Sequence, residues 1–415
     1  MNKKLTVLMI AGAFSAPLAA SADASNVTLF GRVQAEYQST KIDQVGTNDY
    51  RQETISDNAG QSRWGLKVKE DLGNGLSAIA QIEFAFRTGN GVAESAREQW
   101  VGLSSKSWGT AKFGRVQSPF KDFAGGGALD VFNSTTLQAR GTGGALYAPG
   151  NGYGAGSHVD HSVRYDSPDF SGFSAAVLLS PTDATQTDPN PVAPSSVAAN
   201  GGNVGGKGGA NNYQIGLKYQ FGKSGEIFGG YSNDAANDAQ TAVNTNGRFG
   251  DDEEVWRIGG AWNFGDFRIA GQYDNIKHAL AGNGGTTCGG GATANGGEGA
   301  AITTGQCNTA LNTNGDGDIW FLTAQYKLGK TTLVVQGGQT KADAIGASVE
   351  REAKNITLGA VYNFSKRTRV YGGYQRVRID GAGTVANTPN NTQAVVNAFT
   401  QPDRSTWTIG MRHDF

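Results

Sequence analysis

The sequence lacks a long hydrophobic run. No stretch of ~18 apolar residues follows the first residues, which excludes a transmembrane helix. Charged residues make up only 17% of the 415 residues, with 3 methionines and 2 cysteines, whereas charged residues average roughly 25% in soluble proteins. The chain is therefore poor in helix formers, and its composition favours one large β structure over the two or three domains that length alone suggests.

The sequence also lacks a large net charge and lacks histidines at the spacing of metal ligands. Basic and acidic residues number 35 and 36, for a formal net charge of −1, so charge gives no argument for a nucleic-acid partner. Ser157, His158 and Asp160 lie too close in sequence to form a reliable nucleophilic triad. The histidines have no metal-ligand spacing; they are His158, His161, His278 and His413. We predict no metal, no cofactor and no enzyme activity.

The first residues have the pattern of an export signal. A lysine pair precedes a short apolar run from Leu5 to about Leu18, and two Ala-x-Ala cleavage sites follow. This order is typical of a secretory signal peptide over residues 1–24, cleaved after residue 22 or 24. An amphipathic first helix is the less favoured alternative. Residues 25–415 are then expected to form a single domain.

Glycine and alternating hydrophobicity are abundant. Glycine accounts for 62 residues, about twice its average share of ~7%. Apolar and polar residues alternate with period two, which predicts strands with one apolar face; residues 213–221 and 320–328 are clear examples. Turn sequences such as "YQFGKSGEIF" separate the runs. Connections this tight force the flanking strands to pair antiparallel.

The number and spacing of these runs predict a barrel. From Val27 to Phe415 we count about 16 strands, most long enough to cross a bilayer at a tilt. Short turns alternate with long Gly/Asn/Thr-rich loops, whereas a soluble sandwich has loops of similar length at both ends. Aromatic residues concentrate beside the short turns, as in a membrane-interface girdle. We expect an all-β, 16-stranded antiparallel transmembrane β-barrel in a Gram-negative outer membrane, with short periplasmic turns and long extracellular loops.

The chain ends inside a strand pattern, on "TWTIGMRHDF". Terminal residues usually fray, so an apolar terminal strand needs a partner. We expect this strand to pair with the first one, "NVTLFGRVQAEYQ", which closes the barrel and removes both sheet edges. Phe415 would then lie in the aromatic girdle.

Several motifs resemble the general porins of β-proteobacteria and neisseriae, over essentially the whole mature chain. The resemblance implies a homotrimer of 16-stranded barrels, a third extracellular loop folded into the lumen, and a C-terminal Phe415 that is read by the barrel-assembly machinery. Outer-membrane lipid and lipopolysaccharide are the expected surroundings. The motifs are "VTLFGRVQAEY", "SRWGLKVKEDLGNGLSAIAQIE", "WVGLSSKSWGTAKFGR", "HSVRYDSPDFSGF", "YNFSKRTRVYGGY" and "GMRHDF".

Residues 116–160 form a segment far longer than an ordinary loop, and we expect it inside the barrel as the constriction. Its "SPFKDF" stretch favours a short helix, and Asp122 and Asp130 match acidic positions of the family's third loop. Opposed charges across a narrow aqueous gap orient polar solutes; the alternative is that these are simply solvated lumen side chains. The basic residues expected to face the acids are Arg32, Arg63, Lys67 and Arg87, with Arg115 at the entry.

Three further stretches resemble ligand sites but lack decisive residues. "GGNVGGKGG" has phosphate-loop glycines, but Gly208 replaces the Ser/Thr that binds magnesium. "NTNGDGD" begins like a calcium loop, but Thr323 occupies the place of the bidentate glutamate. The acidic run Asp251–Glu254 is typical of a solvated face; a divalent-ion bridge to lipopolysaccharide phosphate is the alternative.

The two cysteines, Cys288 and Cys307, lie in one Gly-rich loop. In an exported protein a pair this close in sequence is expected to form a disulfide rather than a metal site.

The function that follows is passive diffusion of ions and small hydrophilic solutes through a water-filled pore with a weak preference for anions. One alternative is a barrel channel selective for phosphate or small organic anions. A non-transporting barrel that serves adhesion through its long loops is a weaker alternative. An outer-membrane hydrolase is another, because no stretch indicates a nucleophile and a base that converge.

Overall fold

The fold is known from a computed structural model, which describes residues 26–42, 50–57, 62–89, 95–140, 146, 158–181, 211–234, 253–279, 315–343, 350–380 and 404–415. The expected signal peptide, residues 1–24, lies outside the described residues. The predicted disulfide between Cys288 and Cys307 also falls outside them, as do the phosphate-loop-like glycines.

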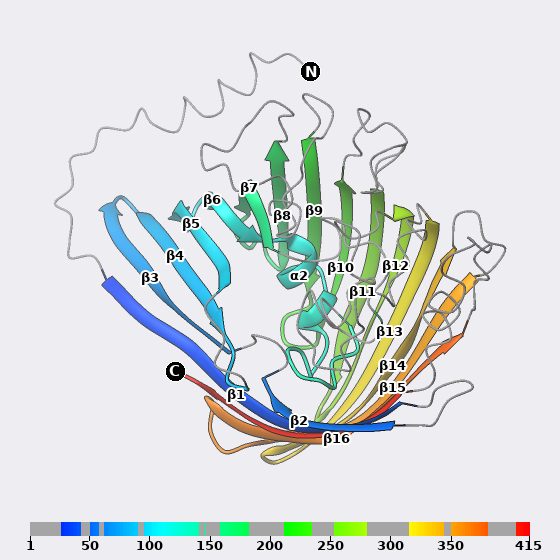
Figure 1. Ribbon diagram of the computed structural model, residues 1–415. Coiled ribbons are helices and arrows are strands. Elements are labelled where there is room, and N and C mark those ends of the chain that lie inside the picture. The colour runs from blue at the N-terminus through cyan, green and yellow to red at the C-terminus, as the bar shows by residue number, and fades with distance from the viewer. Residues whose placement is uncertain are drawn as a thin grey trace, which may run out of the picture.

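The described chain is almost entirely strand (Figure 1). The strands are β1 Asn26–Ile42, β2 Tyr50–Ser56, β3 Ser62–Gly73, β4 Leu76–Phe86, β5 Ser95–Ser105, β6 Gly109–Gln117, β7 His158–Asp166, β8 Phe173–Pro181, β9 Asn211–Gln220, β10 Gly225–Asp234, β11 Glu253–Phe264, β12 Phe267–Ala279, β13 Gly315–Leu328, β14 Thr331–Asp343, β15 Glu350–Asn363, β16 Thr368–Asp380 and β17 Arg404–Asp414. One helical turn, α2 Pro119–Asp122, and one 3-10 turn, η2 Gly126–Ala128, follow β6. No described helix is long and apolar enough to cross a membrane.

The strands form one closed antiparallel barrel. β1 pairs with β2 along residues 36–42 and with β3 along residues 26–32, so β2 and β3 share one position and the barrel is 16-stranded. Each later strand pairs with the next, and β17 returns to pair with β1 from Arg32↔Asp414 to Ile42↔Arg404. The predicted fold, strand number and closure are confirmed.

Tight turns connect the strands at one end of the barrel, where the sequence predicted them. Gly222, Gly265 and Gly329 have φ of 58°, 61° and 59°. This left-handed conformation suits glycine because it has no Cβ. Most connections at the opposite end are longer, as the sequence indicated.

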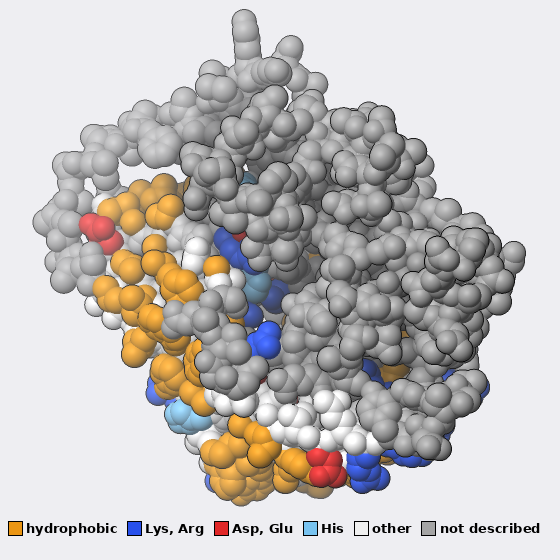
Figure 2. Space-filling model, viewed as in Figure 1, with side chains coloured by type: hydrophobic (Ala, Val, Ile, Leu, Met, Phe, Trp, Pro, Cys, Tyr) orange, Lys and Arg blue, Asp and Glu red, His pale blue; other side chains and the backbone are white. Residues whose placement is uncertain are grey.

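Alternating side chains give the barrel an apolar outside and a polar inside. On β13, the apolar side chains of Trp320 and Leu322 are exposed, whereas the polar side chain of Thr323 is buried. Hydrophobic side chains cover the outer wall over β1, β3 and β4 in the view of Figure 2. An apolar outer surface fits contact with lipid, because lipid tails replace water there.

Aromatic residues form the girdle expected beside the short turns and a second girdle toward the opposite end. Near the short turns, the Tyr219 and Phe221 rings lie 4.9 Å apart, and Tyr362 and Phe364 lie 5.0 Å apart. Toward the opposite end, Tyr231 and Trp256 lie 4.6 Å apart, and Tyr374 and Trp407 lie 4.8 Å apart. Aromatic belts at both interfaces are typical of outer-membrane barrels.

Candidate functional site

The segment after β6 lies inside the barrel, as the α2 ribbon in Figure 1 shows. We call its described part, residues 118–140 and Leu146, the lumen segment. The helix predicted from "SPFKDF" is present as α2, which begins with Pro119 after Ser118. Proline suits a first helical position because its missing N–H would have no partner there. Its apolar side chains are buried against the wall; they are Phe120, Ala124, Leu129, Phe132, Leu137, Ala139 and Leu146.

Glycines on the inner wall make room for these side chains. A Cβ added at Gly216 of β9 would lie 2.9 Å from the Phe123 ring, and one at Gly359 of β15 would lie 2.6 Å from the Phe132 ring. A methyl group at either place would push the ring away. The wall therefore fits the lumen segment closely on two sides of the barrel.

Hydrogen bonds fix the start of the lumen segment to β11 and β12. Arg257 of β11 donates through Nη1 to the carbonyls of Phe120 at 2.6 Å and Ala124 at 2.9 Å. Gln272 of β12 accepts from the N–H of Gly126 at 2.6 Å. These bonds satisfy backbone groups that the short helix leaves unpaired.

A later part of the segment, at Ser134 and Thr136, is fixed to β1. Glu36 Oε1 accepts from the N–H of Thr136 at 2.9 Å and from its hydroxyl at 2.5 Å. Gln34 Nε2 donates to the Ser134 carbonyl at 2.6 Å. The segment thus spans the lumen between two distant parts of the wall.

Basic side chains gather on the wall and on the adjoining start of the segment, and we call Arg63, Arg97, Lys121 and His158 the basic cluster. Arg63 Nη1 lies 3.5 Å from Glu83 Oε1, and Arg97 Nε donates to the same oxygen. Lys121 Nζ of α2 lies 3.5 Å from His158 Nδ1 of β7. Figure 2 shows lysine, arginine and histidine side chains gathered in a hollow of the face in view.

A second group of arginines continues this basic surface along the wall. Arg32 lies opposite Arg63 in the β1–β3 register, and its Nε is 2.7 Å from Asp414 Oδ1. Arg412 of β17 lies opposite Arg369 of β16 and donates through Nε to Gln34 at 2.7 Å. These arginines face the lumen from four neighbouring strands, and we call Arg32, Arg63, Arg369 and Arg412 the basic band.

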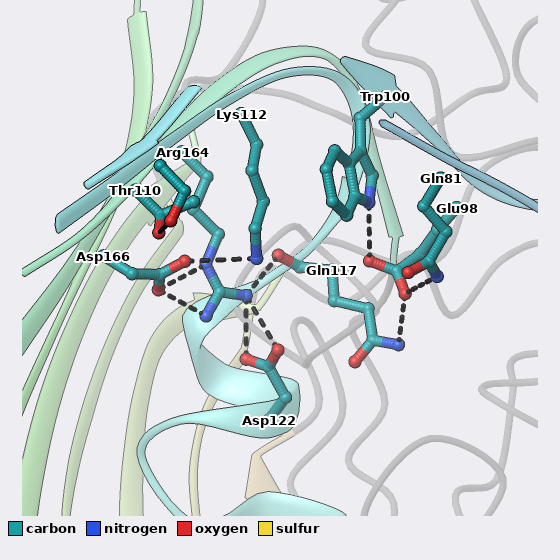
Figure 3. Close-up of polar contacts among 10 residues, drawn as sticks. Gln81, Glu98, Trp100, Thr110, Lys112, Gln117, Asp122, Arg164 and Asp166 are labelled. Atoms are coloured by element: carbon teal, nitrogen blue, oxygen red, sulfur yellow. Dashed lines mark hydrogen bonds and ion pairs between the residues drawn. The ribbon is translucent and has the colours of Figure 1, made fainter. Parts of the chain in front are cut away.

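Acidic side chains interrupt the basic surface near the root of the segment (Figure 3). Arg164 of β7 lies between two carboxylates, with Nη1 2.8 Å from Asp122 Oδ1 and Nη2 2.7 Å from Asp166 Oδ1. Lys112 also contacts Asp166, at 3.2 Å. On the other side of the root, Glu98 accepts from Trp100 Nε1 at 3.1 Å. Both signs of charge are therefore present at this level of the lumen.

Burial changes the ionisation of two residues of the lumen segment. The pKa of Lys121 is well below its ordinary value, because burial and the positive charges of Arg97 and Arg63 disfavour the ammonium. Burial raises the pKa of Asp130 to about 6, although the backbone N–H groups of Arg140, Ala139 and Phe132 bind its carboxylate. Among the described residues, no group of three His, Cys, Asp or Glu side chains has the geometry of a metal site.

A family model described as "Gram-negative porin" matches residues 5–382. This chain belongs to the Gram-negative porin family. Major outer membrane protein P.IB of Neisseria gonorrhoeae is 32% identical over 223 residues, covering 53% of this chain and 54% of the relative. An outer membrane porin protein of Bordetella pertussis is 37% identical over 119 residues, covering 27% of this chain and 28% of the relative. The porin thus spans about half the length, or less, of these curated relatives.

Solved structures agree on the fold. The anion-selective porin from Comamonas acidovorans has a TM-score of 0.64 at 22% identity, covering 94% of this chain and all of that chain. Salmonella typhi OmpF has a TM-score of 0.56 at 14% identity, covering 94% of this chain and 97% of that chain. The porin is an outer-membrane protein, and its family and fold are those of channels.

The predicted basic residues of the porin lie in different surroundings. Arg63 and Arg32 belong to the band described above, while Lys67 is exposed, with Nζ 4.5 Å from the centre of the Phe30 ring. Arg87 is half-buried after β4 and forms no ion pair within the described ranges. Arg115 pairs with Asp160 at 2.5 Å and donates to the carbonyl of Arg97.

The two predicted acidic residues differ from each other. Asp122 is 36% exposed and pairs with Arg164. Asp130 is buried, and its carboxylate accepts from the N–H groups of Phe132 at 2.9 Å and Ala139 at 2.6 Å. Asp130 therefore organises the backbone of the lumen segment.

The site of the porin contains residues that sequence reasoning missed. Arg97 and Glu98 are neighbours, yet both contact inward side chains, Glu83 and Gln81. The β4–β5 register shifts between Ile82 and Phe84, and such a bulge turns adjacent side chains to one face. Period-two alternation assigns Arg97 and Glu98 to opposite faces of the strand, so it could not predict that both side chains face the lumen. Buried Arg140, Arg257 and Asp274 were also missed.

Proposed function

We propose that this porin is a passive, water-filled diffusion channel whose narrow part lies between the lumen segment and the basic band of the wall. The observation that carries the proposal is the local excess of positive charge. Arg63 and Arg97 share the carboxylate of Glu83. Of Arg32, Arg369 and Arg412, only Arg32 forms an ion pair within the described residues, with Asp414. In a narrow aqueous gap, such an excess raises the local concentration of anions.

The proposed selectivity is a weak preference for anions among ions and small hydrophilic solutes. Anion selectivity of the Comamonas acidovorans porin, which has the same fold, supports it. Lys67 and Arg87 are proposed to add to the field at a greater distance, and Arg115 to hold the entry of the segment. Passive diffusion needs no covalent chemistry, so we propose no enzyme activity and no cofactor.

The test is single-channel current in a planar bilayer, followed by the reversal potential across a salt gradient. We expect steady ohmic steps and a reversal potential shifted toward that of chloride. Arg63→Ala should lower the anion-to-cation permeability ratio about twofold, because a charge close to the ion path is removed. The matched control is Lys354→Ala, which removes a positive charge from the outer wall.

Two results would change the proposal. Equal reversal potentials for Arg63→Ala and Lys354→Ala would contradict the proposed charged constriction but not the proposed channel. If folded, heat-modifiable protein gave no current in the bilayer, the channel proposal would be overturned. A non-transporting barrel with an adhesive or catalytic role would then be favoured.

A solute-selective channel for phosphate or small organic anions is the second candidate. Three buried polar atoms near the root of the lumen segment have no hydrogen-bond partner among the described residues: Arg63 Nε, Ser118 Oγ and His158 Nε2. Buried donors without partners favour a bound acceptor. Titrating phosphate into the chamber distinguishes the candidates, because a binding site saturates the phosphate current at low concentration and a simple pore does not.

The proposed partners follow from the outer surface. We propose a homotrimer, supported by the trimer form of Vibrio cholerae OmpT, which shares the fold with a TM-score of 0.53 at 17% identity. Lys354, Arg376 and Arg378 are exposed on the outer wall beyond the Tyr374–Trp407 girdle, where lipopolysaccharide phosphates would complement them. Recognition of Phe415 by the barrel-assembly machinery remains a proposal.

A further inference from the structure

Asp274 of β12 lies fully buried between two arginines from distant parts of the chain. Its Oδ1 accepts from Arg257 Nε at 2.6 Å. Its Oδ2 accepts from Arg140 Nε at 3.1 Å and from Arg140 Nη2. Arg257 is directly opposite Asp274 in the β11–β12 register, whereas Arg140 belongs to the lumen segment.

Each arginine is bound at one end of the lumen segment. Arg257 binds the Phe120 and Ala124 carbonyls at its start, and its guanidinium carbon is 4.4 Å from the centre of the Phe120 ring. Arg140 lies at the far end, where its N–H donates to Asp130 Oδ2 at 3.0 Å. One carboxylate on the rigid wall therefore connects to both ends.

The burial of all three side chains makes Asp274 hard to replace. The relative exposure of the Asp274, Arg257 and Arg140 side chains is 0%, 1% and 4%. Removing the carboxylate would leave two buried positive charges facing each other, and an uncompensated buried charge is strongly unfavourable. Arg257 belongs to the wall and stays, so relief has to come from movement of the segment that carries Arg140.

We propose that Asp274 is the positioning residue of the constriction: it holds the lumen segment against β11 and β12 and so keeps the pore open. This inference rests on the proposed channel function. The wall lies directly behind the segment, where Phe228, Ala270 and Phe321 pack against it. A released segment can therefore move only toward the open lumen, which narrows the pore.

Asp274→Asn is the first test, in a planar bilayer. An amide keeps the shape but loses the negative charge, so we expect a lower mean conductance and roughly tenfold more frequent closures. Glu226→Gln is the matched control, because this inward carboxylate of β10 pairs with Arg268 at 3.8 Å and not with the segment. Asp274→Asn channels with wild-type current and closing frequency would overturn the proposal.

A disulfide separates positioning from a general folding defect. A Cβ added at Gly216 of β9 would lie 3.4 Å from the Ala124 Cβ, close to the range of about 3.5–4.5 Å that disulfides typically need. The Phe123 ring, 2.9 Å from the same Cβ, has to move aside. We would introduce Ala124→Cys and Gly216→Cys with Cys288 and Cys307 changed to serine. In Asp274→Asn, oxidation should restore steady conductance and reduction should abolish it. Persistent closures in the cross-linked protein would overturn the positioning role.

A measurement without current distinguishes failure of the positioning role from failure of the channel proposal. Arg140 is buried in the native barrel, so trypsin should not cut after it in detergent-folded wild type. In heat-modifiable Asp274→Asn barrels, cleavage at Arg140 should become at least roughly tenfold faster, since proteolysis follows the open population. If wild type carried no current but Asp274→Asn still showed this change in cleavage, the channel proposal would be rejected and the positioning role of Asp274 retained. Unchanged cleavage would reject the positioning role.

Discussion

Gly31 and Phe415 exchange two backbone hydrogen bonds across the closing seam of the barrel, with N···O distances of 3.1 and 3.0 Å. The Phe415 ring also covers Gly31, so that a Cβ added to Gly31 would lie 2.3 Å from Phe415 Cζ. The glycine is required by this close approach. The last residue is therefore part of the β1–β17 ladder, and its ring packs on the first strand.

Gly31→Ala should weaken the closed barrel. The new methyl group would meet both the Phe415 ring and, at 2.7 Å, the carbonyl oxygen of Arg63, and such overpacking typically costs about 1–3 kcal/mol. We expect a lower yield of heat-modifiable barrel on refolding and an earlier midpoint of urea unfolding in lipid vesicles.

The control for this change is Gly372→Ala on β16, where the nearest atom to an added Cβ is the Thr408 carbonyl oxygen at 3.1 Å. The substitution is the same, but it meets no aromatic ring. Equal midpoints for the two alanine variants would contradict the proposed packing of Phe415 on Gly31.

Lys121 should make ion selectivity depend on pH. Its pKa is lowered by burial and by Arg97 and Arg63, so its positive charge is lost at a lower pH than that of an ordinary lysine. Loss of the proton removes one positive charge from the constriction, so anion preference should fall as the pH is raised, and it should fall at a lower pH than an ordinary lysine would cause. Reversal potentials measured at each pH in one salt gradient test this.

The matched variant is Lys121→Arg, because a guanidinium remains charged at the pH values at which a lysine titrates. Its anion preference should stay constant with pH. If wild type and Lys121→Arg have parallel pH profiles, Lys121 is not the titrating group.

Most of the barrel could be predicted because its signals are local. Turn glycines such as Gly265 and the alternation around Leu322 depend on neighbouring residues alone, and both are found as expected. The division of one strand position into β2 and β3 was not predicted, because both pair with β1 and the break depends on that pairing.

The candidate site was less predictable because it is built from contacts between distant residues. Arg63 was found by alternation, whereas Arg97 was hidden by a bulge in the β4–β5 register. Arg140 meets Asp274 across 134 positions, and no local pattern marks either residue as a partner. Sequence therefore indicated which segment enters the lumen, and tertiary packing decides which residues hold it there.

The lipid-facing side of β13 offers a test of membrane depth with two chemically matched positions. Leu322 and Leu328 share one strand and one face and are 52% and 50% exposed, but Leu328 adjoins the Gly329 turn while Leu322 lies six positions farther along the strand. An arginine at the bilayer midplane costs about 2–4 kcal/mol, against about 0–1 kcal/mol near the interface. Leu322→Arg should therefore destabilise the barrel much more than Leu328→Arg, as measured by urea unfolding in phospholipid vesicles. If both variants lost the same stability, Leu322 would lie no deeper than Leu328, and the band between the two aromatic girdles would not be the membrane-spanning one.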